Sequence, residues 1–376
     1  MRAAVRPSTS AHLNQGSVHD VTTEQIKEPT ITSADAALAE TTAAIPAVMD
    51  SRRNFIAFGG DMLTFMTGLS FIPATIVMVG MASRLTSDKA LLGIVAMAGS
   101  VAWFLPQIVA ARIVHGKQHQ KKYLVGASAI GRQTYLLMAL WLYMTRAESP
   151  LLTVFVLIAC VAVFHVADSL AGVAWFDMLS RALSPRTRGR SVAIGNLIGL
   201  VGGIGAGFIV ERVLSPSGLP FPVNYALLFF CAWVCFMASF VFILFIKETP
   251  MSAEEHSQTS DSHFIANLRE AVKTDKVFQL LILARVFTGI ETMAMAFYVV
   301  FIRERLNLPD SILGVFSIAA VAGGIVGITF FGWLGDRIGS RGVIRGSVSL
   351  QIVAPIVALI VAGLPVIADS APDVAI

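Results

Sequence analysis

Six ionisable residues stand inside stretches of the sequence that are otherwise apolar, at positions that a lipid bilayer would surround. A charged side chain in hydrocarbon costs about 3 kcal/mol or more, and it persists where it faces other helices or a water-filled cavity. Acids, bases and a histidine in such places suit the binding of a polar solute or the transfer of a proton. The six residues are Asp61, Arg132, His165, Asp168, Arg285 and Glu291.

Glu291 is the sharpest candidate for contact with a solute or a coupled ion. It lies about 15 residues into its apolar stretch, close to the expected middle of the bilayer. Asp61 lies only about seven residues from the start of its own stretch, near enough to the surface to reach water in part. A static pair of Glu291 with Arg285 is the alternative, although the six residues between them do not place both on one helix face.

His165 and Asp168 are three residues apart and share a helix face. This spacing suits a proton-sensitive pair, since histidine changes charge near neutral pH. An equally weighted alternative is that Arg132 and Asp168, at similar expected depth, neutralise each other between two helices.

The elements that hold these residues are predicted to be membrane-spanning helices. The chain of 376 residues is 55% hydrophobic and 14% charged, with a mean hydropathy of +0.73, whereas a soluble domain carries about 25% charge. Its apolar blocks are long enough to cross a hydrocarbon layer about 30 Å thick as helices, and they do not alternate as barrel strands would. The predicted class is all-α, a polytopic membrane protein. The expected spans, about nine, are 54–82, 90–114, 122–144, 150–180, 191–213, 222–246, 276–302, 311–333 and 343–366.

Basic residues in the loops predict the orientation. With the N-terminus inside, 16 of them fall on the cytoplasmic side and 6 on the outer side, which predicts a cell-membrane protein with a cytoplasmic N-terminus. They are spread over loops rather than gathered on one face, so the net charge of +4 does not indicate nucleic-acid binding. Cys160, Cys231 and Cys235 lie in apolar stretches, where neither a disulfide framework nor a metal site is expected.

An internal repeat is visible when the sequence is compared with itself. An offset of 221 residues aligns the first span with the seventh and the second with the eighth, and it places Arg84 on Arg305. Chance similarity between apolar helices is the alternative. Because the repeated unit has six spans, both copies cross the membrane in the same direction. Residue 376 aligns with residue 155, where the first copy enters its fourth span, so the second copy is expected to be incomplete by about three helices.

These observations divide the chain into four predicted regions. Residues 1–52, rich in Ser, Thr and Ala, are expected to form a disordered cytoplasmic tail. Residues 53–247 would form a six-helix bundle, residues 248–275 a polar cytoplasmic linker, and residues 276–376 a partial bundle of three helices.

The loop after the eighth span reads GWLGDRIGSR from residue 332 and resembles the major facilitator superfamily motif GxxxD(R/K)xGx(R/K). Gly332 lets helices approach, Gly339 permits a tight turn, and Asp336 can face a helix N-terminus. Arg337 and Arg341 are expected to stay cytoplasmic. An ordinary charged loop would explain the arginines but not the spacing of the glycines and the aspartate.

The segment SPRTRGR at residues 184–190 also resembles an inner loop of this family. Just before it, Asp177 and Arg181 are four residues apart at the cytoplasmic end of the fourth span. This pair suits either a gate contact or an ordinary helix-end ion pair.

The resemblance implies that the first, fourth, seventh and tenth helices line a central path, which would include Asp61, Asp168 and Glu291. Two departures limit it. His115 occupies the first-half position that corresponds to Asp336, and the glycine-rich fifth span lacks the Gly-Pro pair of the family's antiporter signature. A drug/proton exchanger is therefore not supported by motif.

What the resemblance implies is a secondary transporter that moves a small solute by alternating access and that a coupled proton could drive. The expected partners are the lipid bilayer, an unknown small-molecule substrate and protons, with no nucleic acid, cofactor or metal. The sequence contains no GxxxxGK(S/T) nucleotide-binding loop. Two rival hypotheses remain: a membrane-embedded enzyme, for which His165 and Asp168 alone supply no catalytic set, and a truncated chain that folds but transports nothing.

Overall fold

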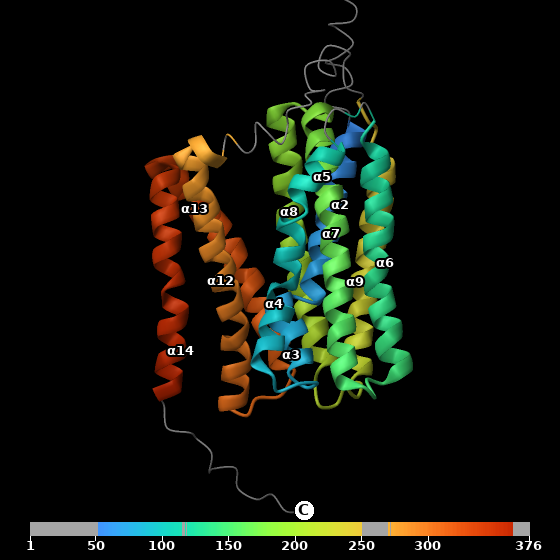
Figure 1. Ribbon diagram of the computed structural model, residues 1–376, viewed down its shortest axis with the longest axis vertical. Coiled ribbons are helices and arrows are strands. Elements are labelled where there is room, and N and C mark those ends of the chain that lie inside the picture. The colour runs from blue at the N-terminus through green and yellow to red at the C-terminus, as the bar shows by residue number, and fades with distance from the viewer. Residues whose placement is uncertain (1–51, 115–116, 118, 250–269, 271, 364–376) are drawn as a thin grey trace, which may run out of the picture. The chain divides into compact units, whose positions relative to one another are not determined.

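Every element of regular structure that the computed structural model describes is a helix (Figure 1), which confirms the all-α class. The described residues are 52–114, 117, 119–249, 270 and 272–363. The α-helices are α2 (Arg52–Phe71), α3 (Val79–Ala82), α4 (Lys89–Phe104), α5 (Gln107–Val114), α6 (Lys121–Thr145), α7 (Pro150–Ala182), α8 (Pro185–Val213), α9 (Val223–Phe245), α12 (Lys276–Arg305), α13 (Ile312–Gln351) and α14 (Val353–Gly363), and a π-helical turn, η1, spans Ala74–Met78.

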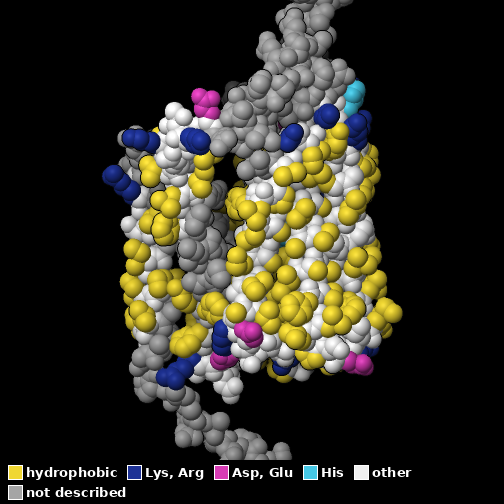
Figure 2. All heavy atoms as spheres, in the orientation of Figure 1, with side chains coloured by type: hydrophobic (Ala, Val, Ile, Leu, Met, Phe, Trp, Pro, Cys, Tyr) yellow, Lys and Arg dark blue, Asp and Glu magenta, His cyan; other side chains and the backbone are white. Residues whose placement is uncertain are grey.

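Helices occupy most of the described part of each range expected from hydropathy. Hydrophobic side chains cover the flanks of these helices, while Lys, Arg, Asp and Glu gather at the helix ends (Figure 2). Such an apolar surface matches lipid rather than water. Among the described residues, six segments are long and apolar enough to cross a membrane: Arg52–Ala82, Lys89–Val114, Pro150–Ala182, Thr187–Val213, Val223–Phe245 and Ile312–Phe331.

The first predicted span is not one uniform helix. Pro73 lacks a backbone N–H and ends α2, and the chain resumes as the π-helical turn η1. The Pro73 carbonyl accepts hydrogen bonds from the backbone N–H groups of Val77 at 2.9 Å and Met78 at 3.3 Å. The proline therefore places a wide turn at the end of this span.

The starts of α2 and α6 and the end of α9 are joined by side chains that satisfy the free backbone groups of the helix ends. Lys121 donates from Nζ to the carbonyls of Leu244 and Ile246, at 2.9 and 2.7 Å. In return, Glu248 Oε1 accepts from the Lys121 backbone N–H at 3.1 Å. Asn54 exchanges two hydrogen bonds with the Lys247 backbone. We call this end of the helices the linker end and the opposite end the far end.

An aromatic cluster packs α6, α7 and α9 together. The rings of Tyr135 and Phe164 lie 4.7 Å apart between centroids, and Phe236 lies 4.9 Å from each of them. All three side chains are buried. Packed aromatic rings add specific edge and face contacts to their large apolar area. Because Tyr135 is one helical turn from Arg132, the cluster also fixes the position of that arginine along the helix axis.

Glycines of α8 allow it to lie against α2 at close range. A Cβ added at Gly195 would lie 2.6 Å from the Gly59 carbonyl oxygen, and one at Gly202 would lie 2.3 Å from Thr67 Oγ1. By contrast, a Cβ at Gly205 would meet no atom within 4 Å. The interface with α2 therefore uses some of these glycines and not others.

Substitution by alanine is expected to affect the stability differently at a glycine that contacts α2 and at one that does not. Gly195→Ala is expected to lower the free energy of unfolding by about 1–3 kcal/mol, because its methyl group must push against the α2 backbone. Gly205→Ala is the matched control and is expected to be neutral or to stabilise by up to about 1 kcal/mol, because alanine favours helix. Thermal unfolding of the full chain in detergent compares the two. Equal midpoints would contradict this account of the interface.

Helix α12, which begins the C-terminal part of the chain, runs in the same direction as the first span. Near its end, Arg303 donates from Nη2 to the Ser83 hydroxyl at 2.7 Å, and Ser83 directly follows α3. The two helical segments therefore finish side by side at the far end, as a parallel repeat requires. Further along, α13 is interrupted at Gly339, whose φ of 73° and ψ of 167° are not helical. Only glycine adopts such a conformation readily, which accounts for its place in the loop motif.

Candidate functional site

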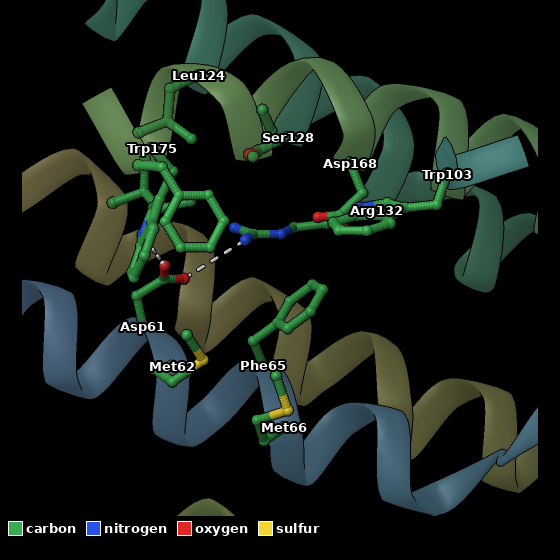
Figure 3. A pocket seen from close by; sticks show the side chains of 14 residues that line it. Asp61, Met62, Phe65, Met66, Trp103, Leu124, Ser128, Arg132, Asp168 and Trp175 are labelled. Atoms are coloured by element: carbon green, nitrogen blue, oxygen red, sulfur yellow. Dashed lines mark hydrogen bonds and ion pairs between the residues drawn. The ribbon is translucent and has the colours of Figure 1, made fainter. Parts of the chain in front are cut away.

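A pocket among α2, α4, α6, α7 and α9 contains three of the six ionisable residues predicted from the sequence: Asp61, Arg132 and Asp168 (Figure 3). Its cavity has a volume of about 140 Å³, smaller than the roughly 300–1,000 Å³ of typical small-molecule sites. Like those sites, it is mostly apolar, with a few polar groups that can set orientation. The apolar walls include Met62, Phe65, Met66, Trp103, Trp175 and Phe176.

Asp61 is buried, with 6% of its surface exposed. Its Oδ2 accepts a hydrogen bond from Trp175 Nε1 at 2.7 Å, and its Oδ1 accepts one from the Ser239 hydroxyl. Arg132 Nη2 also donates to Oδ1, at 3.5 Å. α7 and α9 therefore cover this part of α2 and leave Asp61 little exposed. The expectation that Asp61 reaches water in part stays a prediction.

Arg132 lies between two acids, with 5% of its surface exposed. It donates to Asp61, and it interacts electrostatically with Asp168 beside it (Figure 3). The ring centroids of Phe65 and Phe240 are 5.9 and 5.8 Å from its guanidinium carbon, within range of cation–π attraction. Its Nη1 has no hydrogen-bond partner in the described part of the chain, so one buried donor stays open toward a ligand.

Asp168, on α7, lines the pocket and is only partly buried. Trp103 of α4 lies close to it (Figure 3). Within the described residues, the ionisable side chains that line the pocket are Asp61, Arg132 and Asp168. If all three are charged, the pocket carries one negative charge in excess.

Comparison with known protein families identifies the chain. The sequence pattern of the Major Facilitator Superfamily matches residues 57–371. The chain belongs to the major facilitator superfamily. It is therefore a membrane transporter of the major facilitator type, as the motif at residues 332–341 predicts. No curated protein matches the sequence.

Other residues predicted for this superfamily member lie apart from the pocket. His165 Nδ1 is 2.9 Å from the Val161 carbonyl, and the ring packs against Gly99 of α4, where an added Cβ would be 2.9 Å from Cε1. Asp168, three residues later, instead lines the pocket. The structure thus places the two members of the predicted proton-sensitive pair in different surroundings.

Arg285 and Glu291 belong to α12, but their side chains are outside the described part of the structure. The same holds for Asp336 and Arg341 in the superfamily loop motif, and for any contact of Gly332. Their predicted roles therefore stay predictions.

At the linker end, Asp177 and Arg181 of α7 form the predicted ion pair. Arg181 Nε donates to Asp177 Oδ2 at 3.0 Å and Nη2 donates to Oδ1 at 3.3 Å. Both residues are on one helix and partly exposed. Ion pairs of this kind stabilise a helix by a few tenths of a kcal/mol, about 0.3–0.5. These contacts within α7 are those of a helix-end pair, and the alternative role as a gate contact stays a prediction.

Trp175 and Ser239, which donate hydrogen bonds to Asp61, are not predicted by the sequence reasoning. Trp175 is seven residues after Asp168, two helical turns on the same face, and this spacing could have indicated it. Ser239 gives no such signal, because small hydroxyl residues are common in membrane helices and its partner Asp61 is 178 residues away.

Proposed function

We propose that this superfamily member is a secondary transporter that moves a small solute by alternating access and couples that movement to protons at Asp168. The observation that supports this proposal is the charge imbalance of the pocket. Two carboxylates face one guanidinium there, and Asp61 already has three donors. Asp168 is the carboxylate that this arrangement leaves for a proton.

The physical argument rests on the cost of charge in a poorly solvated place. An uncompensated carboxylate among aromatic walls is costly, and a bound proton removes that cost. Arg132 can compensate only one of the two acids at a time. A rearrangement of the helices that brings Arg132 toward Asp168 would favour release of the proton, and the reverse movement would favour its uptake.

The solute is proposed to bind in the same pocket. Its walls offer the rings of Phe65 and Trp175 and the thioether of Met66, which suit an apolar or aromatic part. The open Nη1 donor of Arg132 suits an acceptor such as a carbonyl or hydroxyl oxygen. Glu291 is proposed as a second polar group that α12 contributes to the path.

For the orientation in the membrane and for the division into regions, we propose what the sequence predicts. The N-terminus lies on the cytoplasmic side of the cell membrane, and the linker end of the helices faces the cytoplasm. A membrane-embedded enzyme receives no specific support from the pocket.

The test uses the full chain in proteoliposomes with a pH-sensitive dye inside. A panel of small solutes is added outside, with and without an inward proton gradient. At least one solute is expected to acidify the interior faster than in protein-free liposomes and to accumulate only when the proton gradient is imposed. Accumulation driven equally by a sodium gradient, or solute entry without any acidification of the interior, would reject proton coupling. A panel in which no solute enters would favour the non-transporting alternative.

A further inference from the structure

A cluster of charged residues joins the N-terminal and C-terminal helices at the far end. Asp310, in the connection between α12 and α13, accepts from Arg303 Nη1 at 3.1 Å, and its Oδ2 lies 3.2 Å from Arg84 Nε. Arg84 follows α3 in the N-terminal part, whereas Arg303 belongs to α12. The Asp310 and Arg303 side chains are only 12% and 11% exposed. One carboxylate thus holds two arginines from opposite sides of the interface.

Arg303 also reaches across the interface by itself. Its Nη2 donates to the Ser83 hydroxyl at 2.7 Å and its Nη1 approaches the Gly80 carbonyl at 3.5 Å. The carbonyls at a helix C-terminus carry partial negative charge and attract a cation. Arg303 is therefore oriented by its own Asp310 and bound by the end of α3.

A second ion pair crosses the same interface. Lys89 Nζ lies 3.5 Å from Glu304 Oε2, and both side chains are exposed. The offset of 221 that relates the two repeats aligns Lys89 with Asp310, so equivalent positions carry opposite charges. A cation at position 310 would instead face Arg84 and Arg303 and would repel both of them. The difference in charge lets two related surfaces attract each other.

Apolar packing lies directly beneath these charges. Leu313 is fully buried, and a Cβ added at Gly80 would lie 2.4 Å from Leu313 Cδ1. Next to it, a Cβ at Gly314 would lie 2.4 Å from the Glu211 backbone nitrogen of α8. Backbones this close leave no room for a solute between them.

We propose that Arg84, Arg303 and Asp310, assisted by Lys89 and Glu304, form a latch that holds the far end closed and must separate when that end opens. The inference rests on the proposed alternating access. Asp310 is its central residue, because it contacts both arginines. The exposed Lys89–Glu304 pair is expected to contribute less, since water and salt screen it.

The test measures the separation of the two sides directly and needs no substrate. Cys160, Cys231 and Cys235 are replaced by alanine in the full chain, and spin labels are attached at Ser87→Cys and Leu306→Cys, two exposed far-end positions. Pulsed electron resonance in lipid nanodiscs then gives the distribution of distances between the labels. A closed latch predicts one dominant short distance.

Asp310→Asn is expected to add a population at longer distance, with the ratio of open to closed rising about fivefold or more, the factor that ~1 kcal/mol corresponds to. The matched control is Asp88→Asn. Asp88 is at the same end and loses the same charge, but its carboxylate only caps α4, accepting from the Ala90 N–H at 2.8 Å. This control is expected to match the parent.

An unchanged distance distribution in Asp310→Asn, with helical circular dichroism retained, would overturn the latch. If that variant does not fold, Arg84→Gln replaces it, because Arg84 is 44% exposed and touches the cluster from one side. The same opening is expected, and its absence would equally overturn the proposal. If the latch proposal fails, the solute-driven proton assay can still support the proposed function. If the solute assay is negative, the distances between the spin labels still test the latch.

Discussion

Asp168→Asn is expected to abolish proton-driven solute accumulation while leaving the protein folded. Asparagine keeps the size of the side chain, but its amide does not bind and release a proton as a carboxylate does. The pocket would then hold one negative and one positive charge at every stage of the cycle, so the difference between its two protonation states disappears. Asp168 has a side-chain hydrogen bond with Trp103, and the asparagine amide oxygen can keep it, so the thermal midpoint is expected to change little.

The measurement is accumulation of an identified solute in proteoliposomes under an inward proton gradient, alongside its exchange between two equal pools without a gradient. Accumulation is expected to fall to the level of protein-free liposomes, while exchange persists. Asp88→Asn is the matched control, with the same chemistry far from the pocket. Unchanged accumulation in Asp168→Asn would refute its coupling role. Loss in Glu291→Gln instead would transfer that role to α12, and loss in neither would leave facilitated diffusion as the simpler account.

Asp61→Asn is expected to have the largest effect on stability. Within the described residues, Asp61 is the carboxylate hydrogen-bonded to the buried Arg132, and the substitution removes its charge and weakens the bonds from Trp175 and Ser239. Breaking a buried ion pair from one side costs about 3–5 kcal/mol, because the remaining charge is left without compensation. The thermal midpoint of the full chain is therefore expected to fall steeply, or the protein to fail to accumulate.

A double variant separates this cause from a loss of shape. Asp61→Asn combined with Arg132→Met removes both charges, and paired apolar replacement is often close to neutral. The double variant is expected to be more stable than Asp61→Asn alone, with a coupling energy of about 1 kcal/mol or more between the two sites. If the changes in thermal midpoint caused by the two single substitutions simply add in the double variant, the Asp61–Arg132 ion pair is not the source of the effect.

The helices could be predicted from the sequence because the bilayer sets their length and composition. Each apolar block of sufficient length must satisfy its own backbone, which leaves helix as the local solution. The π-helical turn after Pro73 was not predicted, since a proline in an apolar run can bend, widen or end a helix. The close approach of α8 to α2 follows from glycine spacing, but the identity of the contacting residues, such as Thr67 with Gly202, needs the helix rotation.

The candidate site was predicted in part. Asp61, Arg132 and Asp168 were found because charge in an apolar block is unusual, and all three line one pocket. The sequence does not show which of the two acids pairs with Arg132, because both carboxylates are within its reach. His165 shows the limit of spacing arguments. Three residues correspond to a rotation of about 300°, so side chains that share a broad face can still point to different neighbours.

The reciprocal hydrogen bonds at the linker end also order the events of biosynthesis. Lys121 needs the carbonyls of Leu244 and Ile246, and the first turn of α6 needs the carboxylate of Glu248. A ribosome makes these partners more than a hundred residues after Lys121. Until then, the starts of α2 and α6 lack the bonds that tie them to α9. The nascent chain therefore completes its sixth helix before these particular hydrogen bonds can form.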